Sequence, residues 1–432
     1  MREDSSHLRP VKSIGIVGLG FVGLPLAVAF AEAGISVAGV DTDRDRVASL
    51  NSGESYIEDV PAERFQPLIA AQKLRPTERY GILREVEAVI ICLPTPLNEY
   101  REPDLSIVVE GAKAVAHNLR SGALVVLEST TYPGTTREVL LPIFERDGRR
   151  VGEDFYLAYA PERVDPGNST YTIENTPRIV GGVTAECARR TEGLYKKITT
   201  EVCRVSKPES AELAKLLENV FRAVNIAMVN ELAILCDRIG VDVWEIVDAA
   251  KTKPYGFMPF YPGPGMGGHC IPIDPFYLSW RARAFDVSTD FIELAGRVNV
   301  NMPYYAFSRI TEALNSHKKP LYGSRVLLLG VSYKPNVGDL RESPSLKILE
   351  LLRSSGAEVV YHDPHVPQLT DYKLNSVKLN EEELSRADCA VVATNHDAID
   401  LRLVIDCASK VVDLRNAVRS RLGQLSANVD VL

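Results

Sequence analysis

Residues 13–41 read SIGIVGLGFVGLPLAVAFAEAGISVAGVD, and this stretch decides how the N-terminal part of the chain folds. An apolar run is followed by glycines in the spacing G-x-G-x-x-G, a stretch with helical periodicity and a second apolar run. The glycines are Gly18, Gly20 and Gly23, and the second run ends at Asp41. The order strand, glycine turn, helix, strand and acid predicts a parallel βαβ unit that binds a dinucleotide.

Each of these residues has its own physical reason to be there. Gly18 allows a tight turn, and Gly20 lets the backbone approach a pyrophosphate at the helix N-terminus. Gly23 lets the helix and the strand lie close together. Asp41 is placed to accept a hydrogen bond from a ribose 2′-hydroxyl and would repel a 2′-phosphate. The sequence therefore predicts NAD rather than NADP as the cofactor, and a glycine turn that binds no ligand is the structural alternative.

Further apolar runs alternate with helical segments, as a doubly wound parallel sheet requires. They are EAVIICLP at 87–94, ALVVLEST at 123–130, FYLAYAPE at 155–162 and RIVGG at 178–182. Ligands of such sheets bind beyond the carboxyl ends of the strands. Polar residues at these ends are candidate ligand contacts or simple turn formers, and they are Thr95, Ser129, Thr130, Glu162 and Arg163.

The pattern then changes to one long helix at 208–239, with proline in its first turn and Gly240 after its last. Lys215, Asn219 and Arg222 share a face of this helix at positions i, i+4 and i+7. They form either a solvated face or part of a site on a helix that joins two domains and supplies a dimer surface.

Residues 324–363 repeat the plan strand, glycine, helix, strand and acid, with Asp363 as the acid. This second unit lacks G-x-G-x-x-G, so it should bind something other than a dinucleotide, or nothing. The predicted fold is α/β, with two Rossmann-like doubly wound domains joined by a long central helix and a helical middle domain. The predicted domains are an NAD-binding domain at 1–205, a central helical domain at 206–315, and a C-terminal Rossmann-like domain at 316–432.

Composition excludes several classes of protein. The 432 residues carry a formal net charge of −8, and the basic residues are scattered, which argues against nucleic-acid or anionic-membrane binding. No run of about 18 apolar residues is present, and the first residues are polar, so we expect a cytoplasmic protein without a spanning helix or secretion signal. Seven widely spaced cysteines predict neither a disulfide framework nor a metal site.

One cysteine is set in unusually bare backbone. Residues 262–275 read PGPGMGGHCIPIDP, in which four glycines precede Cys270 and Asp274 follows it. A thiol near NAD can add to an aldehyde to give a thiohemiacetal, which loses hydride to become a thioester that water cleaves. The glycines would let a substrate reach the sulfur.

These features together resemble the UDP-glucose/GDP-mannose dehydrogenase family over nearly the whole chain. The motifs that carry the resemblance are G-x-G-x-x-G with Asp41 and Arg46, LPTP, ESTTYPGTT, APERVDPGN, ELAKLLENVFRAVNIAMVNELA, GMGGHCIPID and GVSYKPNVGDLRESPS. The resemblance implies NAD-dependent oxidation of the C6 alcohol of a nucleotide sugar to a carboxylate in two steps, through a cysteine-bound thioester. It also implies polysaccharide biosynthesis as the setting, and a homodimer, or a larger homo-oligomer, formed through the helices of 208–300. By the same resemblance the domain at 206–315 would serve dimerisation and catalysis, and the domain at 316–432 would bind the UDP-sugar.

The resemblance assigns roles to individual residues. The implied catalytic residues are Cys270 as nucleophile, with Lys215, Asn219, Asp274, Glu162 and Thr130. The implied cofactor contacts are Gly18, Gly20, Phe21, Val22, Gly23, Asp41, Arg46, Thr95, Thr130 and Arg341. The implied substrate contacts are Glu162, Arg163, Lys215, Asn219, Tyr261, Gly267, Lys334 and Arg415. How Lys215, Asp274, Thr130 and Glu162 share the work of a general base stays open, and no metal is expected.

The cysteine loop departs from the GGSC-FPKD pattern of the glucose-acting enzymes, because His269 and Ile273 stand where serine and lysine would be. It resembles instead the branch that acts on UDP-N-acetylated amino sugars, and within it the UDP-N-acetylglucosamine 6-dehydrogenases. An apolar wall for the acetamido methyl would come from Tyr255, Phe257, Phe260 and Tyr261. UDP-N-acetylmannosamine, UDP-N-acetylgalactosamine and UDP-glucose remain open as substrates.

Two other functional classes fit parts of the sequence. A two-electron hydroxyacid dehydrogenase shares the N-terminal unit and the Lys/Asn pair, but it needs neither Cys270 nor a complete third domain. A redox-sensing, NAD-binding regulator would use the thiol, but it would leave Lys215, Asn219 and Asp274 without a purpose.

Overall fold

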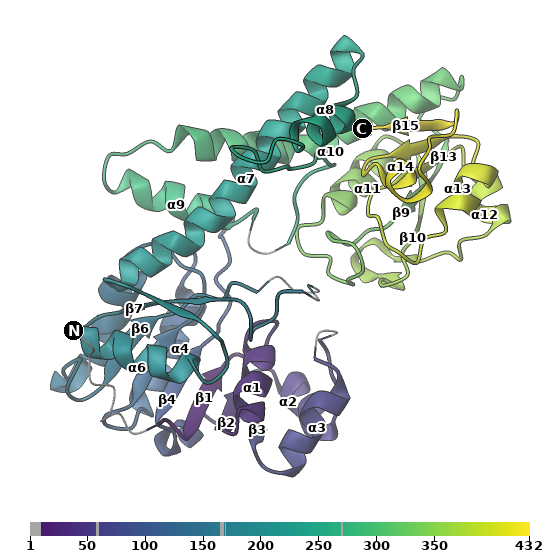
Figure 1. Ribbon diagram of the computed structural model, residues 1–432. Coiled ribbons are helices and arrows are strands. Elements are labelled where there is room, and N and C mark those ends of the chain that lie inside the picture. Colours follow the sequence, from purple (N-terminus) through teal and green to yellow (C-terminus); the bar gives the residue numbers. More distant parts are fainter. Residues whose placement is uncertain (1–9, 58–59, 165–167, 169, 269–270) are drawn as a thin grey trace. The chain divides into compact units, whose positions relative to one another are not determined.

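The computed structural model describes residues 10–57, 60–164, 168, 170–268 and 271–432 (Figure 1). The chain forms two compact units. Unit 1 comprises Met1–Glu218 and Phe276–Val287, and unit 2 comprises Asn219–Pro275 and Ser288–Leu432.

In the described part of unit 1, eight strands form one sheet in the order β3-β2-β1-β4-β5-β6-β7-β8. The strands are β1 (Ser13–Val17), β2 (Ser36–Val40), β3 (Leu74–Thr77), β4 (Ala88–Ile91), β5 (Leu124–Leu127), β6 (Tyr156–Tyr159), β7 (Arg178–Gly182) and β8 (Val202–Val205). Neighbours run parallel except β6 and β7, which are antiparallel. The order 3-2-1-4-5-6 is that of dinucleotide-binding folds, with the chain reversing direction across the sheet between β1 and β4.

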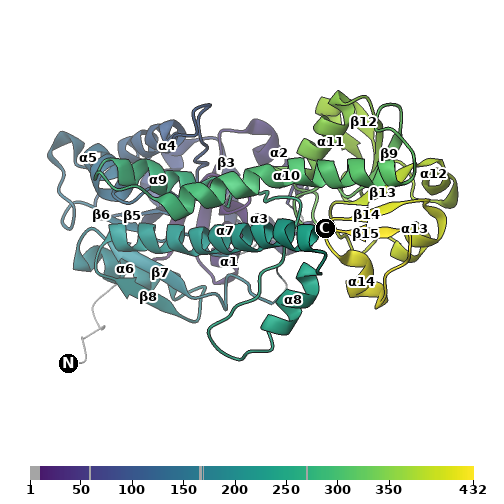
Figure 2. The ribbon, with the colours of Figure 1, turned by 90° about the horizontal axis from the view of Figure 1, so that it is seen from above.

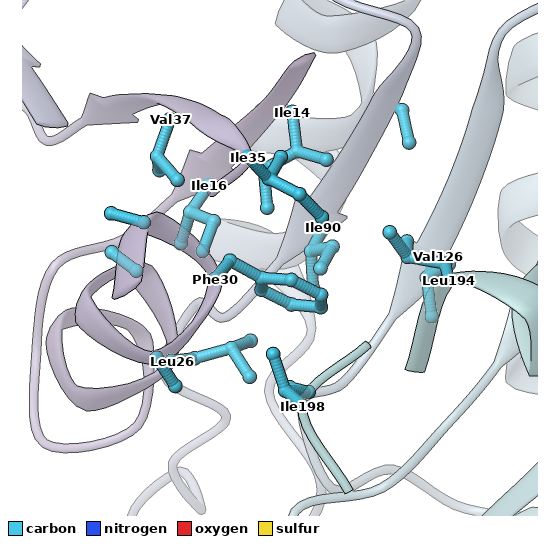
Figure 3. Packing of buried hydrophobic residues seen from close by; sticks show 14 of the residues in the cluster. Ile14, Ile16, Leu26, Phe30, Ile35, Val37, Ile90, Val126, Leu194 and Ile198 are labelled. Carbon is cyan, nitrogen blue, oxygen red and sulfur yellow. The ribbon is translucent and has the colours of Figure 1, made fainter. Parts of the chain in front are cut away.

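The sheet of unit 1 is buried on both faces, as a parallel sheet must be. Side chains alternate along each strand, so that Ile90 belongs to one apolar cluster and Ile91 to the other. Figure 3 shows the first cluster, in which Phe30 lies among Ile16, Ile90 and Ile198. Phe30 is fully buried, so truncating its side chain to alanine should cost about 3–5 kcal/mol.

The helices of unit 1 follow from local sequence signals. Helix α1 begins directly after the glycine turn, and its apolar sequence is almost wholly buried. Asp43 caps α2 by accepting from two backbone N–H groups, and Gly53 ends that helix with a positive φ. The helices are α1 (Gly23–Glu32), α2 (Arg44–Ser52), α3 (Ala62–Ala70), α4 (Ser106–His117), a π-helix at Thr135–Leu140, α5 (Leu141–Phe144), α6 (Ala185–Tyr195) and 3-10 helices at Tyr80–Glu85 and Arg146–Gly148.

Helix α7 (Pro208–Ile239) confirms the long helix predicted from the sequence, and Gly240 follows it with a positive φ. Among the described residues it is the one helix long and apolar enough, by length and composition alone, to cross a membrane. This differs from the expectation of no such segment, because the residues are apolar on average without forming one unbroken run. The finding is weak evidence for a span, since core helices of soluble proteins pass the same test.

In the described part of unit 2, five parallel strands form a sheet in the order β10-β9-β13-β14-β15, and two short strands pair separately. The strands are β9 (Arg325–Leu329), β10 (Glu358–His362), β11 (Gln368–Leu369), β12 (Leu374–Asn375), β13 (Cys389–Val392), β14 (Val411–Asp413) and β15 (Val429–Val431). The remaining helices are α8 (Val243–Ala250), α9 (Asp274–Arg283), α10 (Asp290–Ser316), α11 (Pro344–Ser354), a 3-10 helix at Thr370–Tyr372, α12 (Glu381–Arg386), α13 (Leu401–Cys407) and α14 (Ala417–Leu422).

Two buried asparagines join the long helices of unit 2, which run alongside each other (Figure 2). Asn230 of α7 donates to Asn299 of α10 at 2.9 Å, and Asn299 donates to the carbonyl of Ala223 at 3.0 Å. Buried amides must find such partners, because an unmade hydrogen bond there costs about 1–3 kcal/mol. The pair therefore fixes how α7 and α10 lie against each other.

The predicted fold class is confirmed, with a doubly wound sheet in each unit and long helices in the middle of the chain. The domain boundaries at 205 and 315 stay a prediction. The two compact units separate within α7 and within α9, so they give no test of a three-domain division.

Candidate active site

The glycine turn of unit 1 is built as a dinucleotide turn requires. Gly18 has a φ of +92°, and a Cβ at Gly23 would lie 1.8 Å from the Gly18 carbonyl oxygen. A Cβ at Gly20, by contrast, would meet no atom within 4 Å. Gly18 and Gly23 are thus required by the chain itself, whereas the space at Gly20 is open for a ligand. Phe21 is half-exposed beside the turn, and Val22 precedes α1 as its N-cap residue.

Asp41 directly follows β2, and its carboxylate lies beside the glycine turn. Its carboxylate accepts from the backbone N–H groups of Leu19 at 2.8 Å and Asp43 at 2.9 Å, and Arg46 lies 3.5 Å away. Tyr56 donates to the carbonyl of Leu19 at 2.6 Å, and the Arg46 guanidinium lies 5.9 Å from its ring centroid. Tyr56 was missed by the sequence reasoning, because no local pattern marks it. An acid so oriented beside an open glycine fits the ribose and pyrophosphate of NAD.

The carboxyl ends of β4 and β5 bring two predicted residues together. Thr95 donates from its hydroxyl to the carbonyl of Thr130 at 2.8 Å. The hydroxyl of Tyr277 in turn donates to the carbonyl of Thr95 at 3.0 Å. These bonds fix the turns that follow β4 and β5 beside the reversal point of the sheet, where ligands of such folds bind.

Glu162 follows β6 and is held by three donors. Its Oε1 accepts from the backbone N–H groups of Arg163 and Val164, each at 2.6 Å, and its Oε2 accepts from Arg178 at 2.8 Å. Arg163 itself forms an ion pair with Glu218 of α7 at 2.7 Å and donates to a backbone carbonyl. Glu162 is therefore rigidly placed, and Arg163 links the loop after β6 to α7.

A buried charge cluster that the sequence reasoning missed lies behind Glu162. Arg178, fully buried, pairs with Glu128 as well as with Glu162. Tyr195 donates to Glu128 at 3.0 Å, and the thiol of Cys92 lies 3.9 Å from the same carboxylate. Burial raises the pKa of Glu128 to about 7, although Arg178 works in the opposite direction. The sequence feature that could have revealed this cluster is Glu128 itself, a carboxylate directly after the apolar strand in LVVLEST.

Helix α7 carries both members of the predicted Lys/Asn pair. Lys215 is buried and belongs to unit 1, and Asn219 is buried and belongs to unit 2. The amide of Asn219 donates to Asp274 at 2.5 Å, at the first residue of α9. The structure thus brings Asn219 and Asp274 together, a contact that the sequence did not predict.

Cys270 and His269 lie outside the described residues, but the loop before them is described. The N–H of Gly263 donates to Asn230 at 3.0 Å, and the N–H of Gly268 donates to the carbonyl of Arg341 at 2.9 Å. Cβ atoms at Gly267 and Gly268 would lie 2.5 Å and 2.9 Å from the side chain of Tyr333. The sequence suggested glycines that open a path for substrate. Protein atoms lie against Gly267 and Gly268 on the side where a Cβ would stand, and the path for substrate stays a prediction.

The remaining predicted substrate and cofactor contacts of unit 2 lie on loops of its sheet. Arg415 donates to the carbonyl of Ala393 at 3.0 Å, and its guanidinium lies against Gly263. Burial lowers the pKa of Arg415 to about 10. Lys334 is partly buried, and its carbonyl accepts from the Ser332 hydroxyl at 3.0 Å.

Two further predicted contacts are held by their own neighbours. Arg341 forms a two-point ion pair with Asp339. Tyr261 stacks on Trp244, with ring centroids 5.5 Å apart, and donates to Asp248 at 2.8 Å. Tyr261 is thereby fixed to α8. The other members of the predicted apolar wall are exposed or partly exposed, namely Tyr255, Phe257 and Phe260.

The second unit has an acid in the same position as the first, but a histidine covers its carboxylate. Asp363 accepts from the N–H groups of Val331 at 2.7 Å and His365 at 2.8 Å, which is the pattern seen around Asp41. Here, however, the buried ring of His396 lies 3.1 Å from the carboxylate. Its other ring nitrogen accepts from the N–H of Asn336 at 2.9 Å. A ribose hydroxyl could reach Asp363 only by displacing His396. The second unit therefore has the fold of a dinucleotide-binding domain but a closed site.

Among the residues that the structure describes, no group of three or more His, Cys, Asp or Glu side chains is arranged to hold a metal ion. Unit 1 brings together Thr95 and Thr130, and separately Glu162 and Arg163. Unit 2 brings together Asn219 and Asp274, and the cysteine loop with Arg415. The catalytic and binding roles of all these residues remain predictions.

Comparison with known proteins defines the class. Three domains of the UDP-glucose/GDP-mannose dehydrogenase family match in order, with the NAD-binding domain at residues 12–199, the central domain at 209–301 and the UDP-binding domain at 327–420. The chain belongs to this family, as the sequence motifs predicted, and carries its NAD-binding and UDP-binding domains. The prediction of NAD as cofactor is thereby confirmed at the level of the domain.

Relatives of known name act on several sugars. A UDP-N-acetyl-D-glucosamine 6-dehydrogenase of Pseudomonas aeruginosa is 37% identical over 355 residues, which is 82% of this chain and 83% of the relative. An NDP-N-acetyl-D-galactosaminuronic acid dehydrogenase of Ralstonia solanacearum is 35% identical over 414 residues, 91% and 95% of the two chains. The solved structure of a UDP-D-ManNAc dehydrogenase from Pyrococcus horikoshii matches with a TM-score of 0.88 at 34% identity, covering 97% and 98%.

The different surroundings of Gly20 and Gly23 give a matched pair of variants. Gly20→Ala should fold normally and lose NAD affinity by roughly tenfold or more, because its methyl group would occupy the open side of the turn. Gly23→Ala should unfold at a clearly lower temperature, because its methyl group would meet the Gly18 carbonyl. Thermal unfolding and calorimetric NAD titration measure both. Equal effects of the two substitutions on folding would contradict the assignment of open and closed space.

The raised pKa of Glu128 makes stability depend on pH. Between about pH 4.5 and about pH 7 the folded state keeps a proton on Glu128 that the unfolded state has lost, so stability should fall as pH rises through this window. Glu128→Gln removes the titrating group. The difference in melting temperature, variant minus wild type, should therefore become more positive across the window. Glu63→Gln, at an exposed carboxylate of α3, is the control and should show no such trend.

Proposed function

We propose that this protein oxidises the C6 alcohol of a UDP-N-acetylated amino sugar to the uronic acid, with NAD as oxidant and UDP-N-acetylglucosamine as substrate. The observation that carries the proposal is the ordered match of all three family domains along one chain. Relatives matching most of this chain act on UDP-linked or NDP-linked N-acetylated sugars.

The chemistry needs a thiol and a water in addition to the cofactor. NAD, when bound, supplies the hydride acceptor for both oxidations. Cys270 adds through sulfur to the C6 aldehyde, and the resulting thiohemiacetal carbon loses hydride to become a thioester. Water then attacks the thioester carbonyl, the C–S bond breaks, and the carboxylate and the free thiol are released. Each sugar therefore yields two NADH and one acid.

Described residues have matching tasks in this scheme. Lys215 and Asn219 would hold the C6 oxygen, and the bond from Asn219 to Asp274 fixes the amide in one orientation. Thr130 and Glu162 would bind and activate the water, since Glu162 is a firmly positioned carboxylate at the ligand edge of the sheet. The UDP-sugar would contact Lys334, Tyr261, Gly267, Arg163 and Arg415. Arg341 would reach the cofactor.

The choice among sugars rests on the cysteine loop. The relatives divide among glucosamine, galactosamine and mannosamine derivatives at closely similar identity. The sequence CIPIDPFYL at 270–278 resembles that of the UDP-N-acetylglucosamine 6-dehydrogenases. The aromatic side chains of 255–261 would offer apolar surface to an acetamido methyl group. One of them, Tyr261, is held in place by Trp244 and Asp248.

We propose further that the protein is a homodimer or higher homo-oligomer in the cytoplasm and binds neither nucleic acid nor membrane. Large apolar side chains on α7 are exposed in unit 2, with exposed fractions of 56% at Met228, 53% at Leu235 and 62% at Ile239. Their spacing of seven and four residues places them along one side of the helix. Such a row of exposed apolar side chains is typical of a protein–protein interface.

The oligomer is tested by charge on this row. The double variant Met228→Glu, Leu235→Glu should have the mass of one chain by light scattering, whereas the wild type should have at least twice that mass. Arg222→Glu is the control, because Arg222 is exposed about 120° around α7 from Met228 and should leave the oligomer intact. A wild-type protein that is monomeric at micromolar concentration would remove this part of the proposal.

The function is tested by counting NADH formed from limiting amounts of each nucleotide sugar. UDP-N-acetylglucosamine should yield two NADH per sugar, and its galacto and manno epimers and UDP-glucose should yield little. Two NADH from another sugar would keep the mechanism and correct the substrate. Cys270→Ala should form no acid. One NADH per sugar, or full acid formation by this variant, would contradict the thioester route.

A further inference from the structure

Four strands of unit 1 place buried polar groups at one edge of the sheet. Cys92, Glu128 and Glu162 follow β4, β5 and β6, and Arg178 begins β7. Glu128 and Arg178 are buried, and the side chain of Glu162 is 15% exposed. Glu162 is thus the carboxylate of this cluster that reaches the surface, and Glu128 and Arg178 are more deeply buried.

The antiparallel direction of β7 is the reason that a cation reaches this edge. Tyr159 of β6 pairs with Gly181 of β7, and continuing that register places Arg178 opposite Glu162. A parallel β7 would have brought its first residue to the other edge of the sheet. The direction of β7 therefore places the guanidinium at the carboxyl ends of β5 and β6.

Arg178 divides its donors between the two carboxylates. Its Nη2 donates to Glu162 at 2.8 Å, and its Nη1 donates to Glu128 and, at 3.3 Å, to the carbonyl of Pro161. A buried guanidinium is stable only with such partners. Glu128 is in turn fixed by the Tyr195 hydroxyl at 3.0 Å. A change in the charge or position of Glu128 should therefore shift Arg178, and through Arg178 the carboxylate of Glu162.

We propose that Glu128 and Arg178 are positioning residues for Glu162, and that the ion pairs of Arg178 hold the Glu162 carboxylate where it activates the water that cleaves the thioester. This inference rests on the proposed function, in which Glu162 contacts that water. Glu128 and Arg178 act through Glu162, because both of their side chains are buried.

Charge and shape can be separated at Glu128. Glu128 is ionised above about pH 7, and the comparison is made there. Glu128→Gln then preserves the shape but removes the charge, so that the Arg178 guanidinium is drawn toward Glu162 alone and displaces that carboxylate. Glu128→Asp keeps the charge on a shorter side chain. The loss of one charge-assisted hydrogen bond corresponds to roughly a ten- to hundredfold slower step. The glutamine variant should be slowed by this amount, and the aspartate variant should recover part of the rate.

The affected step has its own signature. If only hydrolysis is slowed, kcat falls, the KM for the UDP-sugar does not rise, and the enzyme accumulates as a covalent sugar adduct during turnover. Intact-protein mass spectrometry of samples quenched in acid measures the adduct. Glu212→Gln is the matched control, because Glu212 is another fully buried carboxylate of unit 1 that bonds to Gly134 and Thr136 instead. It should show no extra adduct.

The outcomes are distinct. Adduct accumulation in Glu128→Gln, partial recovery in Glu128→Asp and none in Glu212→Gln would support the proposal. Equal kcat and adduct levels in Glu128→Gln and wild type, or a glutamine variant more active than the aspartate variant, would overturn it. Failure of the proposed function appears separately, as a wild type that forms no acid from any sugar. In that case crystal structures of wild type and Arg178→Lys decide, because an unmoved Glu162 carboxylate in the variant would refute positioning.

Discussion

Close approach of one backbone segment to another is the constraint on which this structure depends. At Gly23 the first helix touches the carbonyl of Gly18, and that contact sets how α1 covers the sheet and leaves Gly20 open to a ligand. In unit 2 the glycines before Cys270 lie against Tyr333 and Arg415. Glycine therefore has two different functions in this chain. Gly20 leaves open space for a cofactor, whereas Gly23, Gly267 and Gly268 allow other protein atoms to pack closely against the backbone.

The two doubly wound sheets show how one architecture takes two roles. Each places an acid after its second strand, and each acid accepts from the N–H that follows the glycine at the end of the first strand. Around Asp41 the remaining side is bordered by Arg46 and Tyr56, whereas around Asp363 it is filled by His396. Strand order alone thus does not make a dinucleotide site, because one buried imidazole is enough to close it.

Much of the candidate site was readable from the sequence because it is carried by local patterns. Gly18, Asp41, Lys215 and Asn219 have fixed spacings that follow from a turn, a βαβ unit or a helix. The association of Glu128 and Arg178 was not predicted, because it depends on β7 running antiparallel to β6, which fifty residues of intervening chain do not reveal.

The sequence by itself determined the fold class and the cofactor, because apolar periodicity and glycine spacing act over a few residues and need no tertiary context. It indicated the family through motifs that resemble those of its members. The tertiary structure alone decided which polar groups meet: Thr95 with Thr130, Asn219 with Asp274, and Glu162 with a buried guanidinium. Such meetings depend on strand order, direction and register, which are set by burial over the whole sheet. For that reason the chemistry-bearing residues could be named from the chain, while their partners could be seen only in the fold.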